Sequence, residues 1–364
     1  MRTYQIAVLP GDGIGPEVIA EGLRVLEAAA RAEGGFGLKT DTLAAGAQEY
    51  LWSGKPLPDR TLDGCRAADA ILLGAMGLPD VRWPDGTEMV PQIELRFVLD
   101  LYAGIRPIRW YPGVPAVLAQ KQPEQVDFVV VRESTEGMFA SLGGGVVLRD
   151  EVATDQQVIT RKGTERVCRA AFGWARRRAQ ERGRAGRVTC VDKANVFRSM
   201  AFFRKVFYEV AAEFPDVAAD HEYVDACAMK LVRQPERFDV LVAENLFGDI
   251  LSDLGPGLIG GLGLAPSADI GDAAAVFQPT HGTAPDIAGQ GIANPLATIL
   301  SAAMMLEWLG DRHADARVAG AGRRIHHAVE QGLAAGGLRG PDLGGEFTTE
   351  QIGARVAGAI AGGA

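Results

Sequence analysis

The sequence has few of the residues that crosslink small secreted domains or bind zinc. Its four cysteines lie far apart and form no Cys-x-x-Cys pair, which argues against a disulfide framework and a zinc knuckle. Only five histidines are present, and no two have the spacing of metal ligands, so a histidine metal site is not expected. This use of cysteine is typical of a reducing compartment, and we expect a cytoplasmic protein.

Long apolar runs and an excess of positive charge are also missing. The most apolar stretches are short and interrupted by glycine, so none is expected to span a bilayer, and the N-terminus shows no signal sequence. A formal net charge of -9 argues against nucleic acid or an anionic membrane as the main partner. An anionic substrate would therefore need a local basic pocket. The length of 364 residues is enough for two domains.

Patterns of buried strands alternate with helical patterns along the chain. Strands are predicted over residues 5–9, 68–74, 126–131, 187–191 and 238–243, and helices over 93–101, 161–182, 296–309, 315–335 and 349–361. This alternation predicts an α/β fold with a largely parallel sheet. Residues 255–271 and 276–295 are expected to be connections, and residues 137–160 a hairpin-like excursion.

A glycine cluster at residues 11–15 lies between the first strand and the first helix. It is a poor match to a dinucleotide fingerprint, because the sixth position is Pro16 and no clear acidic-ended second strand follows. We instead expect a tight turn that lets the backbone approach a ligand or a neighbouring element.

Two aspartates follow the strand at 238–243. Asp249 and Asp253 are four residues apart, so on a helix both carboxylates lie on one face and repel each other. A divalent cation such as Mg²⁺ or Mn²⁺ between them would remove this repulsion. The alternative is a solvated acidic helix face, but the apolar residues around the pair favour a site. Asp225, within an otherwise apolar run, is a candidate third carboxylate.

Four basic residues could contribute to such a site. Arg96, Arg106 and Arg132 are candidates for binding carboxylates, since the guanidinium group matches a carboxylate with two hydrogen bonds. Each of them alone could equally be an ordinary surface residue. Lys193 directly follows a strand and is a candidate general base if it is desolvated or lies near a metal. The alternative for Lys193 is an exposed loop lysine.

Seven motifs now form a recognisable series. They are LPGDGIGPE at 9–17, ELR at 94–96, RP at 106–107, RESTEG at 132–137, DKANV at 192–196, NLFGDILSD at 245–253 and HGTAPDIAGQGIANP at 281–295. In this order they resemble the β-decarboxylating dehydrogenases of the isopropylmalate/isocitrate/tartrate family, with the pattern closest to its 3-isopropylmalate branch.

The resemblance implies the two-domain fold of the isopropylmalate and isocitrate dehydrogenases, which is not a Rossmann fold. Residues 1–100 plus 257–364 would form the cofactor-binding domain. Residues 101–256 would form the domain for substrate, metal and dimerisation, with a protruding arm near 137–160.

The resemblance also implies a reaction, namely the NAD-dependent and divalent-metal-dependent oxidative decarboxylation of a 3-substituted malate-type 2-hydroxy acid. The three arginines would hold the carboxylates of this dicarboxylate substrate. Asp249, Asp253 and the partner subunit's Asp225 would bind Mg²⁺ or Mn²⁺, and the partner subunit's Lys193 would take the hydroxyl proton. The protein would thus be a homodimer with shared active sites, with K⁺ as a candidate activator.

By the same resemblance, the 281–294 loop would hold the cofactor, with Gln278 near the nicotinamide. The implied contacts are Gln278, His281, Gly282, Thr283, Ala284, Pro285, Asp286 and Asn294. Asp286 would accept hydrogen bonds from the adenosine ribose and repel a 2′-phosphate, which predicts NAD over NADP.

The chain departs from the family pattern near the reacting groups. Phe139 stands where the family has a tyrosine that acts as general acid, and phenylalanine has no proton to donate. Gln278 replaces a glutamate near the nicotinamide. Gln92 and Ile93 replace a Leu-Leu pair around the C3 substituent, and a buried amide favours a polar substituent such as the hydroxyl of tartrate. Val196, by contrast, keeps an apolar character that would suit an isopropyl group.

Three alternatives to the 3-isopropylmalate reaction therefore stay open. One is a decarboxylating tartrate or D-malate dehydrogenase. Another is a catalytically impaired relative that binds a dicarboxylate or nucleotide without turning it over. The third is an enzyme that dehydrogenates its substrate without efficient decarboxylation.

Overall fold

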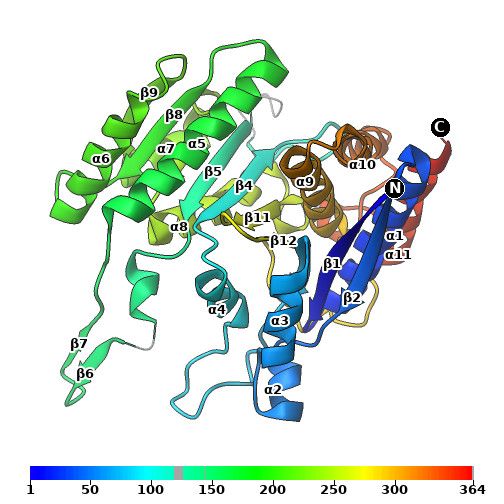
Figure 1. Cartoon of the computed structure of the whole chain (residues 1–364), viewed down its shortest axis with the longest axis horizontal. Helices are drawn as coiled ribbons and strands as arrows, with labels where there is room; N and C mark the ends of the chain where they lie inside the picture. The colour runs from blue at the N-terminus through cyan, green and yellow to red at the C-terminus, as the bar shows by residue number, and fades with distance from the viewer. Residues whose placement is uncertain (119–125, 143, 363–364) are drawn as a thin grey trace.

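The computed structural model describes residues 1–118, 126–142 and 144–362. In this part of the chain, ten strands form one sheet in the order β2-β1-β3-β12-β11-β4-β5-β10-β8-β9, which runs through the whole molecule (Figure 1). The strands of this sheet are β1 (Arg2–Gly11), β2 (Phe36–Thr42), β3 (Ala70–Ala75), β4 (Ala103–Arg109), β5 (Asp127–Glu133), β8 (Arg187–Asp192), β9 (Ala218–Tyr223), β10 (Val240–Ala243), β11 (Pro266–Ile270) and β12 (Ala275–Pro279).

Helices cover both faces of the sheet. They are α1 (Gly15–Glu33), α2 (Ala47–Ser53), α3 (Asp59–Ala67), α4 (Pro91–Val98), α5 (Arg161–Arg182), α6 (Arg198–Ala211), α7 (Val224–Arg233), α8 (Asn245–Ile259), α9 (Leu296–His313), α10 (Ala316–Ala334) and α11 (Thr349–Gly362). Helices α5 and α9 lie on one face, and α3 and α8 pack on the other. No helix in the described residues is long and apolar enough to cross a membrane.

The sheet is parallel toward both edges and antiparallel at its centre. The pairings β12–β11, β11–β4 and β4–β5 are antiparallel, and the other pairings of the sheet are parallel. The predicted α/β fold with a largely parallel sheet is therefore confirmed. The strands from β2 to β11 in this order come from the two ends of the chain, and those from β4 to β9 come from its middle. The domain boundaries at residues 100 and 257 stay a prediction.

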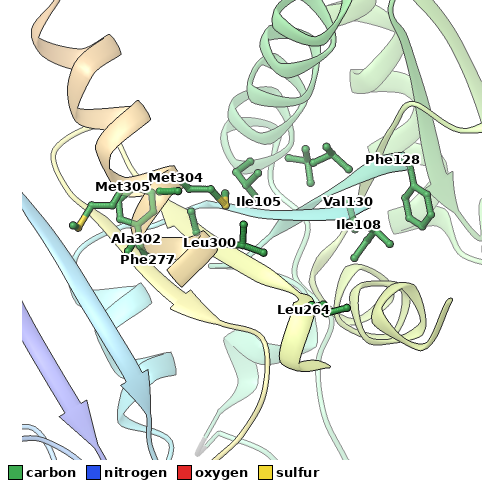
Figure 2. Close-up of a cluster of buried hydrophobic side chains, with 14 of the residues drawn as sticks. Ile105, Ile108, Phe128, Val130, Leu264, Phe277, Leu300, Ala302, Met304 and Met305 are labelled. Carbon is green, nitrogen blue, oxygen red and sulfur yellow. The ribbon is translucent and has the colours of Figure 1, made fainter. Parts of the chain in front are cut away.

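Alternation along the strands divides the core into layers. In β1, Ile6 and Val8 belong to the main core, whereas Ala7 and Leu9 belong to a second cluster on the opposite face. Both faces are covered, which explains why these strands read as continuous apolar runs. Figure 2 shows the main core where α9 meets the central strands.

Two predicted connections are wrong. Helix α8 continues through Gly255, Pro256 and Gly257, and the strands β11 and β12 follow inside the segments expected to be irregular. Glycine is required at 255 because an added Cβ would lie 2.6 Å from Ile108 Cδ1. Here glycine permits close packing of a helix on the sheet, so its presence did not mark a loop.

The glycine cluster at residues 11–15 is the expected tight turn. Gly13 has a φ of 58°, and an added Cβ would lie 2.0 Å from the carbonyl oxygen of Thr283. The amide of Ile14 donates a 2.9 Å hydrogen bond to this same carbonyl. The turn thus holds the start of the 281–294 loop against the carboxyl end of β1.

A short antiparallel hairpin of β6 (Val146–Leu148) and β7 (Val152–Thr154) extends away from the sheet, at the lower left of Figure 1. This confirms the predicted hairpin-like excursion. Its apolar side chains are solvent-exposed, with Val147 at 68% and Leu148 at 57%.

Candidate active site

A pocket of about 170 Å³ lies over the centre of the sheet, between α4, α8 and the start of the 281–294 loop. Its lining includes Arg96 from α4, Arg106 from β4, Arg132 from β5, and Asp249 and Asp253 from α8. The fold therefore brings together the three arginines and the two aspartates that the sequence analysis selected separately.

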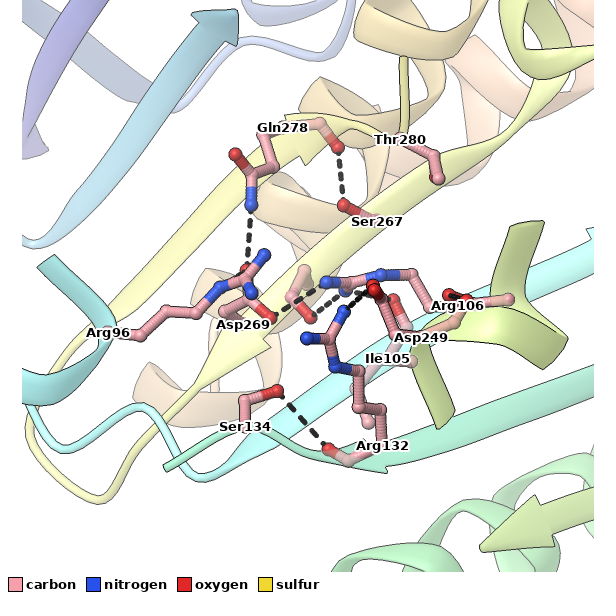
Figure 3. Close-up of polar contacts among 12 residues, drawn as sticks. Arg96, Ile105, Arg106, Arg132, Ser134, Asp249, Ser267, Asp269, Gln278 and Thr280 are labelled. Carbon is pink, nitrogen blue, oxygen red and sulfur yellow. Dashed lines mark hydrogen bonds and ion pairs between the residues drawn. The ribbon is translucent and has the colours of Figure 1, made fainter. Parts of the chain in front are cut away.

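Two of the arginines are fixed by a carboxylate that the sequence analysis missed. Asp269, on β11, is fully buried; its Oδ2 accepts from Arg96 Nε at 3.1 Å and its Oδ1 from Arg106 Nη2 at 2.9 Å (Figure 3). Burial by itself would raise the pKa of Asp269, but Arg106 and Arg96 bring this pKa down to about 2. The available signal was an acid within an apolar stretch, which the prediction of a connection over 255–271 concealed.

Gln278 joins the same network. Its side-chain Nε2 donates to Asp269 Oδ2 at 2.7 Å, and it lines the arginine pocket from β12. The carboxylate of Asp269 thus receives hydrogen bonds from two arginines and one amide, a set that satisfies a buried anion.

Arg132 has a separate set of partners on α8. Its Nε and Nη2 donate to Asn245 Oδ1 at 2.9 and 2.6 Å, and its Nη1 pairs with Asp249. Burial and the neighbouring charges of Arg96 and Arg106 lower the pKa of Arg132 to about 10, against the opposing effect of Asp249. The guanidinium group lies over the ring of Phe139, with its Cζ 4.9 Å from the ring centroid.

The start of α8 aims its two aspartates at the pocket. Buried Glu244 caps the helix, because its carboxylate accepts from the amides of Leu246 and Phe247. Within α8, burial and the charge of Asp249, one turn earlier, raise the pKa of Asp253. A cation at this position would relieve that repulsion, as the residue spacing predicted.

The third predicted metal ligand lies elsewhere in this chain. Asp225 on α7 is 67% exposed and pairs with Lys193 Nζ at 2.8 Å, and this contact lowers the pKa of Asp225. Neither residue lines the pocket, and the same is true of Val196, which is 60% exposed. Within the described residues, no three side chains of His, Cys, Asp or Glu come together as a metal site.

The predicted cofactor residues divide into two groups. His281 and Gly282 line the arginine pocket together with Gln278, and His281 has a buried Nε2 without a hydrogen-bond partner. Burial lowers the pKa of His281, so its imidazole is neutral near pH 7. The remaining predicted residues, which do not line the pocket, are Thr283, Ala284, Pro285, Asp286 and Asn294.

Within this second group, Asn294 and Asp286 differ in how they are used. Asn294 is buried and already engaged, since its Nδ2 donates to Asp342 at 2.9 Å and its Oδ1 accepts from the amide of Leu296. Asp286 is exposed in the loop, and its carbonyl accepts from Gln290. The carboxylate of Asp286 is therefore placed to meet solvent or a ligand.

Gln92 also lines the pocket, from the same face of α4 as Arg96. Its Oε1 is buried without a hydrogen-bond partner. Its neighbour Ile93 does not contribute to the lining. An unpaired acceptor at this place is costly unless a ligand donates to it.

The model of the isocitrate/isopropylmalate dehydrogenase family matches residues 5–356 of this chain. The chain belongs to this family. It is 46% identical to the 3-isopropylmalate dehydrogenase of Thermobifida fusca, with 99% of this chain and 98% of that protein covered. It is 42% identical to the tartrate dehydrogenase/decarboxylase of Pseudomonas putida, with 99% and 98% covered.

The structure of isocitrate dehydrogenase from Methylococcus capsulatus matches the fold with a TM-score of 0.87 at 40% identity, covering 98% of this chain and 99% of that one. The predicted resemblance and fold class are therefore confirmed. The chain is a decarboxylating dehydrogenase that acts on a CH–OH group, and enzymes of its family act on small dicarboxylates with a nucleotide cofactor and a metal.

Proposed function

We propose that this enzyme catalyses the NAD-dependent and divalent-metal-dependent oxidative decarboxylation of a 3-substituted malate-type 2-hydroxy acid. The observation that supports this most is the charge balance of the pocket. Three arginines face three aspartates there, namely Asp249, Asp253 and Asp269. A divalent cation would add two positive charges, and the two carboxylates of the substrate would neutralise them.

The residues of the pocket fit a hard cation. Asp249 and Asp253 offer carboxylate oxygens on one helix face, and burial together with the charge of Asp249 raises the pKa of Asp253, although Arg132 and Arg106 oppose this. We propose Mg²⁺ or Mn²⁺ on Asp249, Asp253 and Asp225 from a second copy of the chain, with K⁺ as a candidate activator. When bound, the metal would polarise the substrate hydroxyl and stabilise negative charge that develops on the substrate oxygens.

The side chains of the enzyme would hold and deprotonate the substrate. Figure 3 shows that three arginines converge, namely Arg96, Arg106 and Arg132. Each can donate a hydrogen bond to a carboxylate oxygen of the substrate, which orients the C2 hydroxyl. Lys193 would accept the hydroxyl proton. Phe139 lies against the guanidinium of Arg132, but it cannot return a proton to the product.

We propose NAD as the hydride acceptor in the segment of Gln278 and the 281–294 loop. The exposed carboxylate of Asp286 would accept from ribose hydroxyls and repel a 2′-phosphate. The unpaired, buried Nε2 of neutral His281 is available to a ligand of this segment.

We further propose a homodimer whose subunits complete each other's sites. Lys193 and Asp225 lie outside the pocket of their own chain. Next to them, the adjacent helices α7 and α8 expose Met229, Val232 and Ile250 at 52%, 41% and 56%. Exposed apolar side chains on packed helices are typical of an interface, and a two-fold contact would bring Lys193 and Asp225 to the partner's pocket.

Mixed dimers test the shared site. Arg132→Gln and Lys193→Ala, expressed together with different tags and purified through both, should give dimers with one intact site and about half of wild-type activity. Each variant alone should be nearly inactive. If every site lay within one chain, the mixed dimer would be as inactive as its parents, and the proposal would be overturned.

A second candidate is favoured by the unpaired Oε1 of Gln92, which would accept a hydrogen bond from a C3 hydroxyl. This favours tartrate over 3-isopropylmalate, whereas D-malate has no C3 hydroxyl and is a candidate by its smaller size alone. NADH formation with Mn²⁺ and K⁺ should be compared for 3-isopropylmalate, D-malate, the tartrates and isocitrate, with NAD and NADP, and should be lost in EDTA. Metal-dependent binding without NADH formation would instead support the impaired relative that Phe139 and Gln278 suggest.

A further inference from the structure

A second cavity, of about 270 Å³, lies behind the sheet from the arginine pocket. Its floor is made of buried side chains that include Ala103, Ile105, Phe277 and Met304, and Figure 2 shows Ile105 and Met304 approaching each other there. Residues next to these in sequence, such as Arg106 and Gln278, line the arginine pocket on the opposite face. The two pockets therefore share strands but not side chains.

The walls of the cavity come from two helices that approach from different halves of the sheet. Helix α5 contributes Trp174 and Gly173, and helix α9 contributes Trp308. Tyr102 and Phe277 complete a largely aromatic lining. The rim residues Trp174 and Trp308 are only partly buried and Gly173 is exposed, so a small molecule can reach the floor. A cavity of about 150 Å³ holds a benzene ring, so this one has room for a fused two-ring system.

Two charged residues, Arg177 and Glu307, lie in the lining. The carboxylate of Glu307 receives fewer hydrogen bonds than it can accept. Arg177 distributes its donors among Glu307 at 3.0 Å, Asp311 at 2.7 Å and Glu181 at 3.1 Å. The Oε1 atom of Glu307 lies 3.7 Å from His326 Nε2, which is too far for a hydrogen bond. Among the described residues, Glu307 thus receives one hydrogen bond, from Arg177, and retains capacity for a further donor.

We propose that this cavity is a second ligand site, for a fused-ring aromatic amine whose ring lies among Tyr102, Trp174, Phe277 and Trp308 and whose ammonium group donates to Glu307. Aromatic side chains attract both the flat ring and the positive charge of such a ligand. Arg177 is already divided among three carboxylates, so it offers little to an anionic ligand. The site is independent of the substrate pocket, and its test does not require enzyme activity.

Calorimetric titration with three matched probes tests the proposal. Tryptamine should bind with a dissociation constant of about 0.1 mM, as expected for a ligand of this size. Indole should bind more weakly, and indole-3-acetate at least tenfold more weakly than tryptamine. Glu307→Gln should remove the preference for tryptamine over indole-3-acetate.

The location is tested by filling the cavity. A Cβ added at Gly173 meets no atom within 4 Å, so Gly173→Leu extends into open space at the cavity and should weaken tryptamine binding at least tenfold. Gly358→Leu is the matched control, because Gly358 is another exposed helical glycine with nothing within 4 Å. Absence of tryptamine binding at millimolar concentration, or equal binding to both leucine variants, would overturn the proposal.

Discussion

Strands β4, β11 and β12 separate two pockets that are built from neighbouring residues of the same segments. On one face, Arg106, Asp269 and Gln278 line or support a polar site. On the other face, the adjacent residues Ile105, Ile270 and Phe277 line an aromatic and aliphatic cavity. Because successive side chains of a strand point to opposite faces, three short strands can support two chemically unlike sites back to back.

A carboxylate with little solvent exposure belongs to each pocket, and the two behave in opposite ways. Asp269 is paired with two arginines, and its pKa falls to about 2. Glu307 shares one arginine with two other carboxylates, and burial raises its pKa to about 7. The number of cations available to each carboxylate, more than its depth, therefore decides whether it is charged at neutral pH.

The largest effect on stability should come from removing the negative charge of Asp269 on the polar face of the sheet. Asp269→Asn leaves Arg96 and Arg106 buried without their shared counterion, and breaking a buried ion pair on one side costs about 3–5 kcal/mol. We expect a corresponding fall in the midpoint of urea denaturation.

Asp216→Asn provides the control for this loss. Asp216 forms a comparable pair with Arg176, but on the surface, where solvent screens the contact. Its replacement should leave the urea midpoint almost unchanged. Equal falls in the urea midpoint of the two variants would show that the buried ion pairs of Asp269 contribute no more to stability than the surface pair of Asp216.

Glu307 should make stability fall as the pH rises. Its folded-state pKa of about 7 lies above the ordinary glutamate pKa of 4.5, so between these pH values the folded protein holds a proton that the unfolded chain releases. The folded state thus loses up to about 3 kcal/mol relative to the unfolded state as the pH rises from about 4.5 to about 7. Glu307→Gln lacks this component, so urea midpoints of both proteins over this range give the contribution of Glu307 by difference.

The comparison with Glu307→Gln is needed because another group near Glu307 also titrates in this pH range. His326 has its pKa lowered to about 4 by burial and by Arg109 and Arg177, which gives a slope of opposite sign between pH 4 and 6.5. That slope is present in both proteins, so the difference gives the contribution of Glu307 together with its effect on His326, whose Nε2 lies 3.7 Å from Glu307 Oε1. If the difference between wild type and Glu307→Gln does not change with pH, Arg177 alone keeps Glu307 ionised and the comparison with Asp269 fails.

The sequence identified the members of the polar site far better than their arrangement. Arg96, Arg106, Arg132, Asp249 and Asp253 could be chosen in advance, because charged residues at the ends of apolar runs are rare enough to notice. Sequence patterns could not show which of them lie close together, since β4 and β11 belong to the antiparallel centre of a sheet that is parallel toward its edges.

Asp269 and the second cavity were beyond the reach of sequence patterns for a related reason. β11 and β12 have only five residues each and follow a glycine-bearing helix end, so their segments resembled loops. The cavity requires α5 and α9, which lie more than a hundred residues apart in the chain, to stand on the same face of the sheet. Local periodicity carries no information about such a distant pairing.

The smallest effect should come from making one position of the polar pocket apolar. Gln92→Leu removes the buried, unpaired Oε1 and adds aliphatic surface beside Arg96, so it should change the kcat/KM ratio of 3-isopropylmalate to tartrate by about tenfold in favour of 3-isopropylmalate. Stability should not fall, because no hydrogen bond to Oε1 within the protein is lost. Gln331→Leu on the exposed side of α10 is the control and should leave the ratio unchanged. A ratio that does not move in Gln92→Leu would show that the C3 substituent is selected elsewhere, and Val196 would be the next position to change.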